Sequence, residues 1–197
     1  VAAPRPAQAG IASAANSTIP RHVLLVGRTG TQADTALGSF TVVSRDLTNS
    51  PQSDRPVEFR LLDCAGARLG TDQLQSGVVT ACATRGVTQS TDFHGTVRFA
   101  VVGGGIPGGL ASTTPCAQIF SRGVLLGTVH VAYLDLDGSE GLGSNDLSLW
   151  LSDFGLDEAV SRSDFDGDAA VGASDLSLWL AAWSGGNSAE SASAYCP

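Results

Sequence analysis

Acidic side chains recur at alternating positions in the segment from residue 164 to residue 175. Carboxylates stand at its positions 1, 3, 5 and 12, and an apolar pattern typical of a short helix follows at once. This is the arrangement of a twelve-residue calcium loop, in which alternate side chains turn inward and the last carboxylate reaches back from a helix start. The predicted ligands are Asp164, Asp166, Asp168 and Asp175, with the backbone carbonyl of Ala170 at position 7.

The same pattern occurs 29 residues earlier, in residues 135–146. A neutral serine stands at its position 5, so we expect this first site to bind calcium more weakly, because affinity follows ligand charge. At position 6, where such loops usually have glycine, the chain has Glu140 and Ala169, and we expect neighbouring glycines to absorb the turn. The predicted ligands are Asp135, Asp137, Ser139, the Gly141 carbonyl and Asp146, which gives two calcium ions in all.

A single Asp-x-Asp-Gly is commonly no more than a surface turn, but each of these two copies also leads into the same apolar pattern. Apolar residues follow at spacings i, i+3, i+4 and i+7, which predicts a helix with one apolar stripe. We expect the two helices to pack on each other, since neither can bury its stripe alone, and Asp146 and Asp175 to act as N-caps. The stripes are Leu147, Trp150, Leu151 and Phe154, then Leu176, Trp179, Leu180 and Trp183.

This duplicated unit, residues 131–186, resembles the dockerin family, whose modules have two EF-hand-type calcium loops ending in Asp-Leu, each followed by a helix. The resemblance implies a cohesin partner, contacted by loop positions 10 and 11 and by the helices. Those positions hold Ser144 and Asn145 in the first loop, and Ala173 and Ser174 in the second.

Short β-branched or aromatic segments separated by turn residues fill the chain before the first loop. About seven such segments in so short a span predict a β-sandwich. The glycine-rich run Gly103–Gly109 lacks the spacing of a dinucleotide-binding motif and is expected to be a loop. The predicted strands are residues 22–26, 39–44, 57–62, 77–81, 96–102, 117–120 and 124–133.

Two turn motifs add a second resemblance. Residues 46–57 end in Pro-Val, and residues 91–99 read Thr-Asp-x-x-Gly-x-x-x-Phe. Both look like the bacterial Ig-like repeats of invasin-type surface proteins, which implies a structural or adhesive module. The fold class expected is therefore mainly β, an Ig-like β-sandwich followed by a small α-helical dockerin-like module. The expected divisions are an extended arm at 1–21, the sandwich at 22–133, the calcium module at 134–186 and a tail at 187–197.

Charge is divided unevenly along the chain. Residues 1–133 hold 7 acids and 10 arginines, a net charge of +3, whereas residues 134–197 hold 12 acids and one arginine, a net charge of −11. The arginines are scattered, which argues against nucleic-acid binding, and no apolar run approaches the length of a membrane span. The acidic half is what two calcium sites require.

Four cysteines without metal-ligand spacing indicate disulfides and an oxidising, extracellular compartment. Of the three possible pairings, we favour Cys64 with Cys82 and Cys116 with Cys196, and a Cys196 that links to another chain is the alternative. The chain begins Val-Ala-Ala-Pro, which we interpret as the start of a processed, exported protein.

No catalytic constellation is evident, and the chain is not expected to be an enzyme. His22, His94 and His130 are interpreted as ordinary strand or turn residues. We expect the N-terminal arm to lie against either its own domain or another copy. Two hypotheses for function remain. In the first, the chain assembles with copies of itself into an extracellular filament or surface structure, and the arm reaches into a neighbouring copy and adds to its sheet edge. In the second, the helical module binds a cohesin-like protein.

Overall fold

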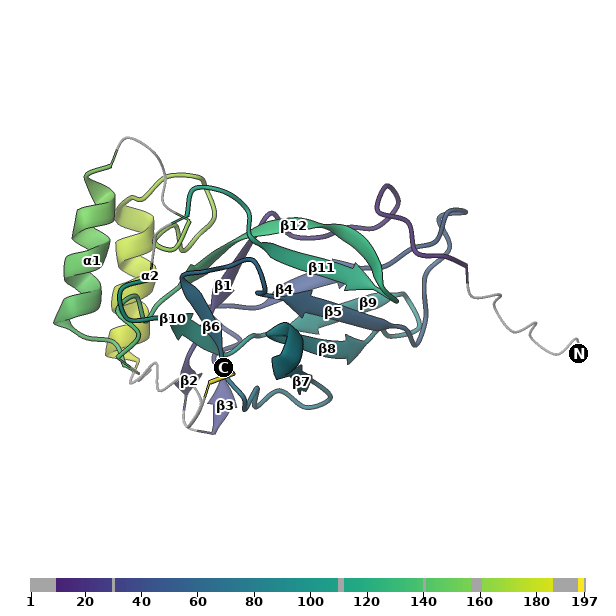
Figure 1. The fold of residues 1–197 in the computed structure, drawn as a ribbon, viewed down its shortest axis with the longest axis horizontal. Coiled ribbons are helices and arrows are strands. Elements are labelled where there is room, and N and C mark those ends of the chain that lie inside the picture. The colour runs from purple at the N-terminus through teal and green to yellow at the C-terminus, as the bar shows by residue number, and fades with distance from the viewer. Residues whose placement is uncertain are drawn as a thin grey trace, which may run out of the picture.

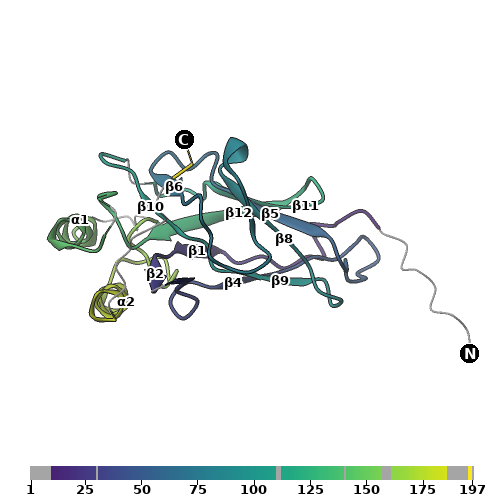
Figure 2. The same ribbon diagram turned by 90° about the horizontal axis from the view of Figure 1, so that it is seen from below.

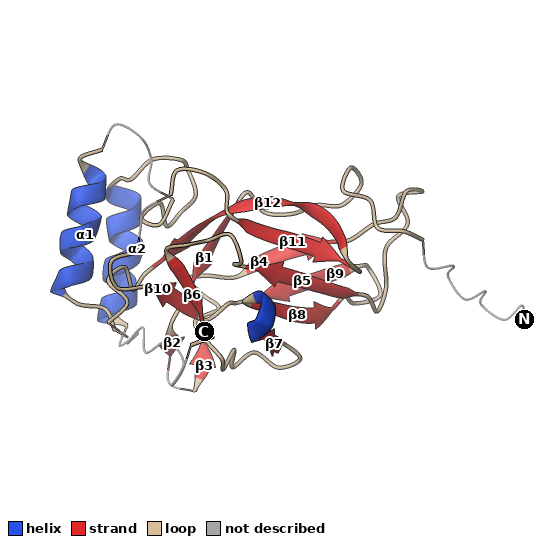
Figure 3. Cartoon of the chain, viewed as in Figure 1, coloured by secondary structure: helices blue, strands red, loops and turns tan. Residues whose placement is uncertain are grey.

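The computed structural model describes the chain from Gly10 to Cys196 with several short gaps. Strands make up most of its regular structure, and two helices lie at one end of an elongated body (Figures 1 and 3). Among the described residues, no helix has both the length and the apolarity needed to cross a bilayer. The described residues are 10–29, 31–109, 112–139, 141–156, 161–185 and 195–196.

The main sheet has six strands in the order β1-β12-β11-β5-β8-β7. Its strands pair antiparallel except β1 and β12, which run parallel with His22 opposite His130. They are β1 (His22–Leu25), β5 (Pro56–Arg60), β7 (Val79–Ala81), β8 (Gly86–Ser90), β11 (Ala117–Ser121) and β12 (Val124–Tyr133).

Three smaller strand pairs complete the β structure. They are β4 (Phe40–Val43) with β9 (Thr96–Phe99), β6 (Ala67–Leu69) with β10 (Gly103–Gly105), and β2 (Arg28–Thr29) with β3 (Gln32–Ala33); a short 3-10 helix, η1 (Cys82–Thr84), follows β7.

The β4–β9 pair lies against the main sheet as a second layer (Figure 2). Strand alternation explains this packing, because every second side chain of a strand points to the same face. Phe40 contacts Phe99 within the pair and Phe59 of β5 across the layers, with ring centroids 5.3 and 5.4 Å apart. The result is a two-layer β structure compatible with the predicted sandwich.

The seven predicted strands correspond to β1, β4, β5, β7, β9, β11 and β12. One prediction was wrong: Gly103–Gly105, expected to be part of a loop, forms β10 and pairs antiparallel with β6. Glycine is needed in β10 because a Cβ on Gly103 would lie 2.5 Å from the Arg68 carbonyl oxygen.

Part of the predicted N-terminal arm lies on its own domain. Ala12 bridges to Asp46 and Thr18 bridges to Val43, the last residue of β4, and Ala12 is buried. Residues 10–21 therefore extend the sheet of the same chain, and residues 1–9 lie outside the described residues.

The two helices form after the acidic loops, as predicted. Helix α1 spans Ser144–Phe154 and α2 spans Ala173–Ser184. The prediction that Asp146 and Asp175 are N-caps was wrong by three residues. Gly143 and Gly172 occupy the N-cap positions, and each aspartate accepts a hydrogen bond from the N-cap backbone N–H at 2.7 Å.

The apolar stripes of the helices are only half buried. Trp150 and Trp179 are 3% and 2% exposed and belong to the same buried cluster as the strand residues. The expectation that the stripes cover each other was wrong, because the outer residues remain exposed. These are Leu151, Phe154, Leu180 and Trp183, with exposed fractions of 56%, 55%, 41% and 57%.

Candidate metal centre

The first acidic loop follows β12 directly, so the sheet fixes where it starts. One carboxylate oxygen from each of Asp135, Asp137 and Asp146 lies within 4.8 Å of the others. The Asp146 side chain also accepts hydrogen bonds from the backbone N–H of Leu136 at 2.7 Å and of Asp137 at 3.0 Å. The last residue of the loop thus reaches back from α1 to its beginning, as the spacing predicts.

The second loop repeats this frame. Asp164, Asp166 and Asp168 bring carboxylate oxygens within 4.8 Å of one another. Asp175 accepts from the backbone N–H of Phe165 at 2.6 Å and of Asp166 at 3.1 Å, the same two loop positions that Asp146 holds in the first copy. The two copies of the repeat therefore fold into the same acidic loop.

Left-handed residues make the turn in both loops. Gly138 and Gly167, at position 4, have φ of 71° and 76°, and Ala169, at position 6, has φ of 69°. The expectation that glycines absorb the turn is therefore correct at position 4, but in the second loop Ala169 also adopts the conformation that calcium loops usually reserve for glycine. Glu140, its counterpart, lies outside the described residues.

The other predicted ligands lie within the same two loops. The backbone N–H of Ser139 donates to Asp135 and Asp137, at 3.1 and 2.8 Å, and the N–H of Ala170 donates to Asp168 at 2.9 Å. Gly141 is half-buried, whereas Ala170 is exposed. The role of the Ser139 hydroxyl and of the two position-7 carbonyls as ligands stays a prediction.

Burial acts against the charge of these carboxylates. It raises the pKa of Asp146 and of Asp164 above the usual range, and repulsion from neighbouring carboxylates adds to the effect. For Asp137, burial acts in the same direction, but hydrogen bonds from Ser139 outweigh it and lower the pKa. Crowded, partly buried carboxylates of this kind favour a bound cation that offsets their charge.

The donor set fits calcium. Each cluster offers oxygen atoms only, from at least three carboxylates. Calcium takes six to eight oxygen ligands, whereas zinc prefers nitrogen and sulfur. Asp135, Asp137 and Asp146 would hold the first ion, with Asp164, Asp166, Asp168 and Asp175 around the second. A bound ion would supply the positive charge that keeps each loop closed against self-repulsion.

The first loop rests on the strands β6 and β10. The Gly105 N–H donates to the Asp135 carbonyl oxygen at 2.7 Å, and a Cβ on Gly104 would lie 3.0 Å from Asp135 Oδ2. Arg68 of β6 donates to the Gly138 carbonyl oxygen at 2.5 Å. The triple glycine of β10 thus leaves room for a buried carboxylate above it.

The second loop rests on β1. A Cβ on Gly167 would lie 2.8 Å from the His22 side chain, and burial together with His130 lowers the His22 pKa to about 4. His130 Nδ1 lies 2.8 Å from Ser161 Oγ. The two strand histidines thus pack beneath the second loop.

An ion pair fixes α1 to the segment before the second loop. Arg162 Nε and Nη2 donate to the two carboxylate oxygens of Asp153 at 2.7 and 2.8 Å, and Ser163 Oγ donates to Asp153 Oδ2. The Tyr133 N–H donates to the Arg162 carbonyl oxygen at 3.2 Å. Local sequence spacing does not reveal this pair, although Arg162 is the one arginine among the acidic residues of 134–197.

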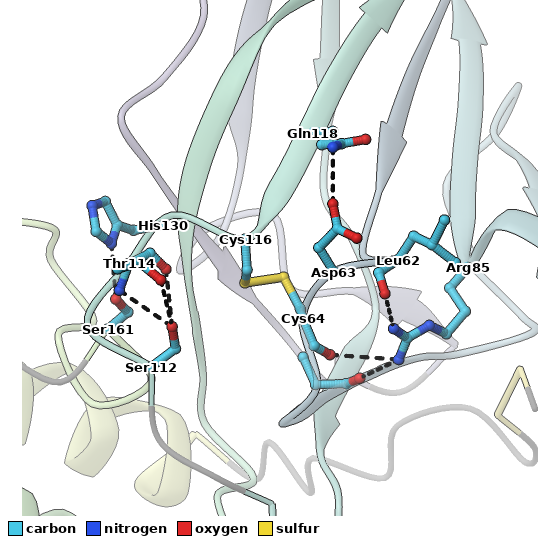
Figure 4. The surroundings of a disulfide bond; sticks show 11 residues. Leu62, Asp63, Cys64, Arg85, Ser112, Thr114, Cys116, Gln118, His130 and Ser161 are labelled. Atoms are coloured by element: carbon cyan, nitrogen blue, oxygen red, sulfur yellow. Dashed lines mark hydrogen bonds between the residues drawn. A yellow bond between two sulfur atoms is a disulfide. The ribbon is translucent and has the colours of Figure 1, made fainter.

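The cysteines pair differently from the favoured prediction. The bridges are Cys64–Cys116 and Cys82–Cys196, and no described cysteine is free. Cys64 and Cys116 lie near the same end of the paired strands β5 and β11, a proximity that local sequence does not reveal. Figure 4 shows this bridge beside Arg85, which donates to the carbonyl oxygens of Leu62, Cys64 and Ala67.

Comparisons with known proteins add little. No family model and no curated protein matches the chain. The chain is similar to a solved structure, the adhesin InvE of Yersinia pseudotuberculosis, at 21% sequence identity and a TM-score of 0.28. That similarity covers 65% of this chain and 29% of the adhesin, and at so low a TM-score the site is argued from the chain's own geometry.

Proposed function

We propose that this chain is an extracellular structural protein whose helical module is held in shape by two calcium ions. The observation that carries the proposal is the repeated loop geometry. Both loops close with their position-12 aspartate hydrogen-bonded to the N–H groups of positions 2 and 3, and both gather three carboxylates within 4.8 Å. Two unrelated surface turns would not account for the same hydrogen-bond geometry in both copies.

Two further features support a structural role outside the cell. The two disulfides join segments 52 and 114 residues apart in sequence, which is typical of proteins that fold in an oxidising compartment. The calcium loops sit on the sheet strands, so each ion would tie the helices to the β domain. Such a role needs no catalytic group.

Calorimetric titration of the metal-free protein with calcium tests the proposal directly. We expect two ions per chain in the wild type and one ion in either Asp135→Asn or Asp164→Asn. Asp63→Asn is the control, because Asp63 lies beside a disulfide and accepts a hydrogen bond from Gln118 rather than joining either loop. Absence of calcium binding by the wild type would overturn the proposal.

Assembly with copies of itself is the second part of the proposal. Residues 10–21 pair with their own domain, so we assign strand addition to a neighbouring copy to the rest of the predicted arm, residues 1–9. Electron microscopy with calcium and then with chelator should show an assembly that dissociates on chelation. A deletion of residues 1–9 should abolish the assembly and leave the fold intact, and single particles throughout would contradict self-assembly.

The alternative function, docking onto a cohesin-like protein, is favoured by a different observation. Leu151 and Phe154 of α1 occupy the same repeat positions as Leu180 and Trp183 of α2, and all four are exposed. Exposed apolar groups of this kind are typical of partner surfaces. The double variant Phe154→Ser/Trp183→Ser distinguishes the two, because it should abolish docking by the helices while assembly through residues 1–9 survives.

A further inference from the structure

Arg68 brings a positive charge to the first acidic loop. Its Nη2 lies 3.9 Å from Asp135 Oδ2 and donates to the Gly138 carbonyl oxygen of the same loop. The Asp135 side chain is fully buried, and that of Arg68 is 16% exposed. The Arg68 guanidinium, which comes from β6, is therefore nearly buried beside the carboxylate that is predicted to be the first calcium ligand of this loop.

The C-terminal tail fixes the position of this guanidinium. Arg68 Cζ lies 3.4 Å from the ring centroid of Tyr195, a cation–π contact. Tyr195 bridges to Gly70 just after β6, and the next residue, Cys196, is bound to Cys82 and donates its N–H to Leu69. Disulfide, tail and strand together hold Arg68 against the loop.

The second loop has no comparable arginine in the part of the chain that the structure describes. Among the described residues, no arginine lies within ion-pair distance of Asp164, Asp166, Asp168 or Asp175. Arg21 lines the cavity of about 310 Å³ beside this loop, but it is exposed to solvent. A charge there is screened far more than one enclosed between a strand and a buried carboxylate.

From this difference we infer that Arg68 is a built-in counter-charge that lowers the calcium affinity of the first loop, and that Tyr195 holds it in place. The inference rests on the proposed calcium sites. A bound calcium ion and the guanidinium would share the Asp135 carboxylate, and two cations at close range repel. The Gly138 carbonyl is at position 4, which is not a ligand position, so Arg68 keeps that hydrogen bond when calcium binds.

Arg68 would make the two loops differ in the calcium concentration at which each one fills. The first loop would fill only at calcium concentrations well above those that fill the second. When the first loop is empty, Arg68 would replace part of the missing charge and keep the loop on β10. The chain would then respond to calcium in two steps, with a persistent second site and an exchangeable first site.

The experiment measures the first loop alone. In full-length protein carrying Asp164→Asn and Asp168→Asn, calcium binding by calorimetry and terbium luminescence report on the first loop only. Adding Arg68→Gln, which retains a donor for Gly138 and removes the charge, should tighten binding by about tenfold. Arg68→Lys should tighten it less, and Tyr195→Ala should shift it in the same direction as Arg68→Gln by a smaller factor.

The control is Arg85→Gln, which removes an arginine that also binds carbonyl groups of the β domain but whose hydrogen bonds go to residues outside both loops. Its first-loop affinity should match that of the Asp164→Asn/Asp168→Asn parent, with intact disulfides and an unchanged circular dichroism spectrum confirming the fold. Unchanged or weaker binding in Arg68→Gln overturns the inference while leaving the calcium sites in place. A wild type that binds no calcium would instead overturn the proposed function.

Discussion

The two acidic loops share one backbone frame but differ in their surroundings. In the first, Asp135 and Asp146 are buried, position 5 is a serine, and Arg68 stands beside the ligands. In the second, the aspartates at positions 1 and 12 are also buried, whereas Asp166 at position 3 and Asp168 at position 5 are exposed. Both loops thus bury their first and last carboxylates, and they differ in the charge at position 5 and in the arginine beside the first loop.

This difference teaches that sequence repeats need not make equivalent sites. Ligand charge alone predicts weaker binding by the first loop, because it has one carboxylate fewer. The nearby Arg68 guanidinium acts in the same direction, since it repels additional positive charge at the site. The repeated sequence determines the loop geometry, whereas residues of the underlying strands would modify the calcium affinity.

Removal of both ions should produce the largest effect. Without calcium the loops repel themselves, and short helices are marginal alone. We expect chelation to melt residues 134–186 while the disulfide-linked sheets persist, with a loss of up to about 8 kcal/mol if each ion is present at 1,000 times its Kd. Far-ultraviolet circular dichroism and thermal melting with and without chelator measure this. Identical spectra and melting temperatures would contradict it.

Removal of a disulfide should have the next largest effect, and the two bridges should differ. Each closes a long loop, so Cys64→Ser/Cys116→Ser and Cys82→Ser/Cys196→Ser should each cost ~4–5 kcal/mol in the chain-entropy model. Only the second pair anchors Tyr195 beside Arg68. Chemical denaturation measures the cost, and calcium titration should show altered first-loop affinity for the second pair alone. An equal effect of both pairs on that affinity would rule out the tail as the anchor.

Single-loop variants compare the sites themselves. Asp164→Asn should cost up to about 4 kcal/mol of calcium-dependent stability, because it empties the tighter site. Asp135→Asn should cost less calcium-dependent stability, since the site that it empties is weaker. Melting temperatures at matched calcium concentrations give the order. A larger loss for Asp135→Asn would reverse the assignment of the stronger site.

Local spacing accounts for what could be predicted from the sequence. The loops, both helices and the strands with alternating apolar residues were found because each depends on residues close together in the chain. The wrong predictions concern features that depend on contacts between residues far apart in the chain. The disulfide pairing follows from the neighbourhood of β5 and β11, and β10 has only glycines and hence no side-chain pattern.

Dependence on distant contacts also explains why sequence spacing did not predict the position of Arg68 or the exposure of the helix residues. Arg68 and Asp135 come together only because β6 pairs with β10, on which the first loop rests. The stripes of α1 and α2 have correct periodicity, but their burial depends on where the loops hold the helices. Periodicity identifies an apolar face without identifying what covers it.

The smallest expected change in the free energy of unfolding comes from backbone strain at position 6 of the second loop. Ala169 has φ of 69°, a left-handed conformation that costs an alanine roughly 1–2 kcal/mol. Ala169→Gly relieves this strain but gives the unfolded chain more freedom, so the net gain should be about 1 kcal/mol in the calcium-bound state. Ala170→Gly is the matched control, because Ala170 is not among the residues with positive φ and should only lose stability, by about 0.5 kcal/mol. Opposite signs for these neighbours, with first-loop affinity unchanged in both, would show that strain belongs to the second loop's turn. Equal signs would mean that the turn at position 6 does not limit how that loop closes around calcium.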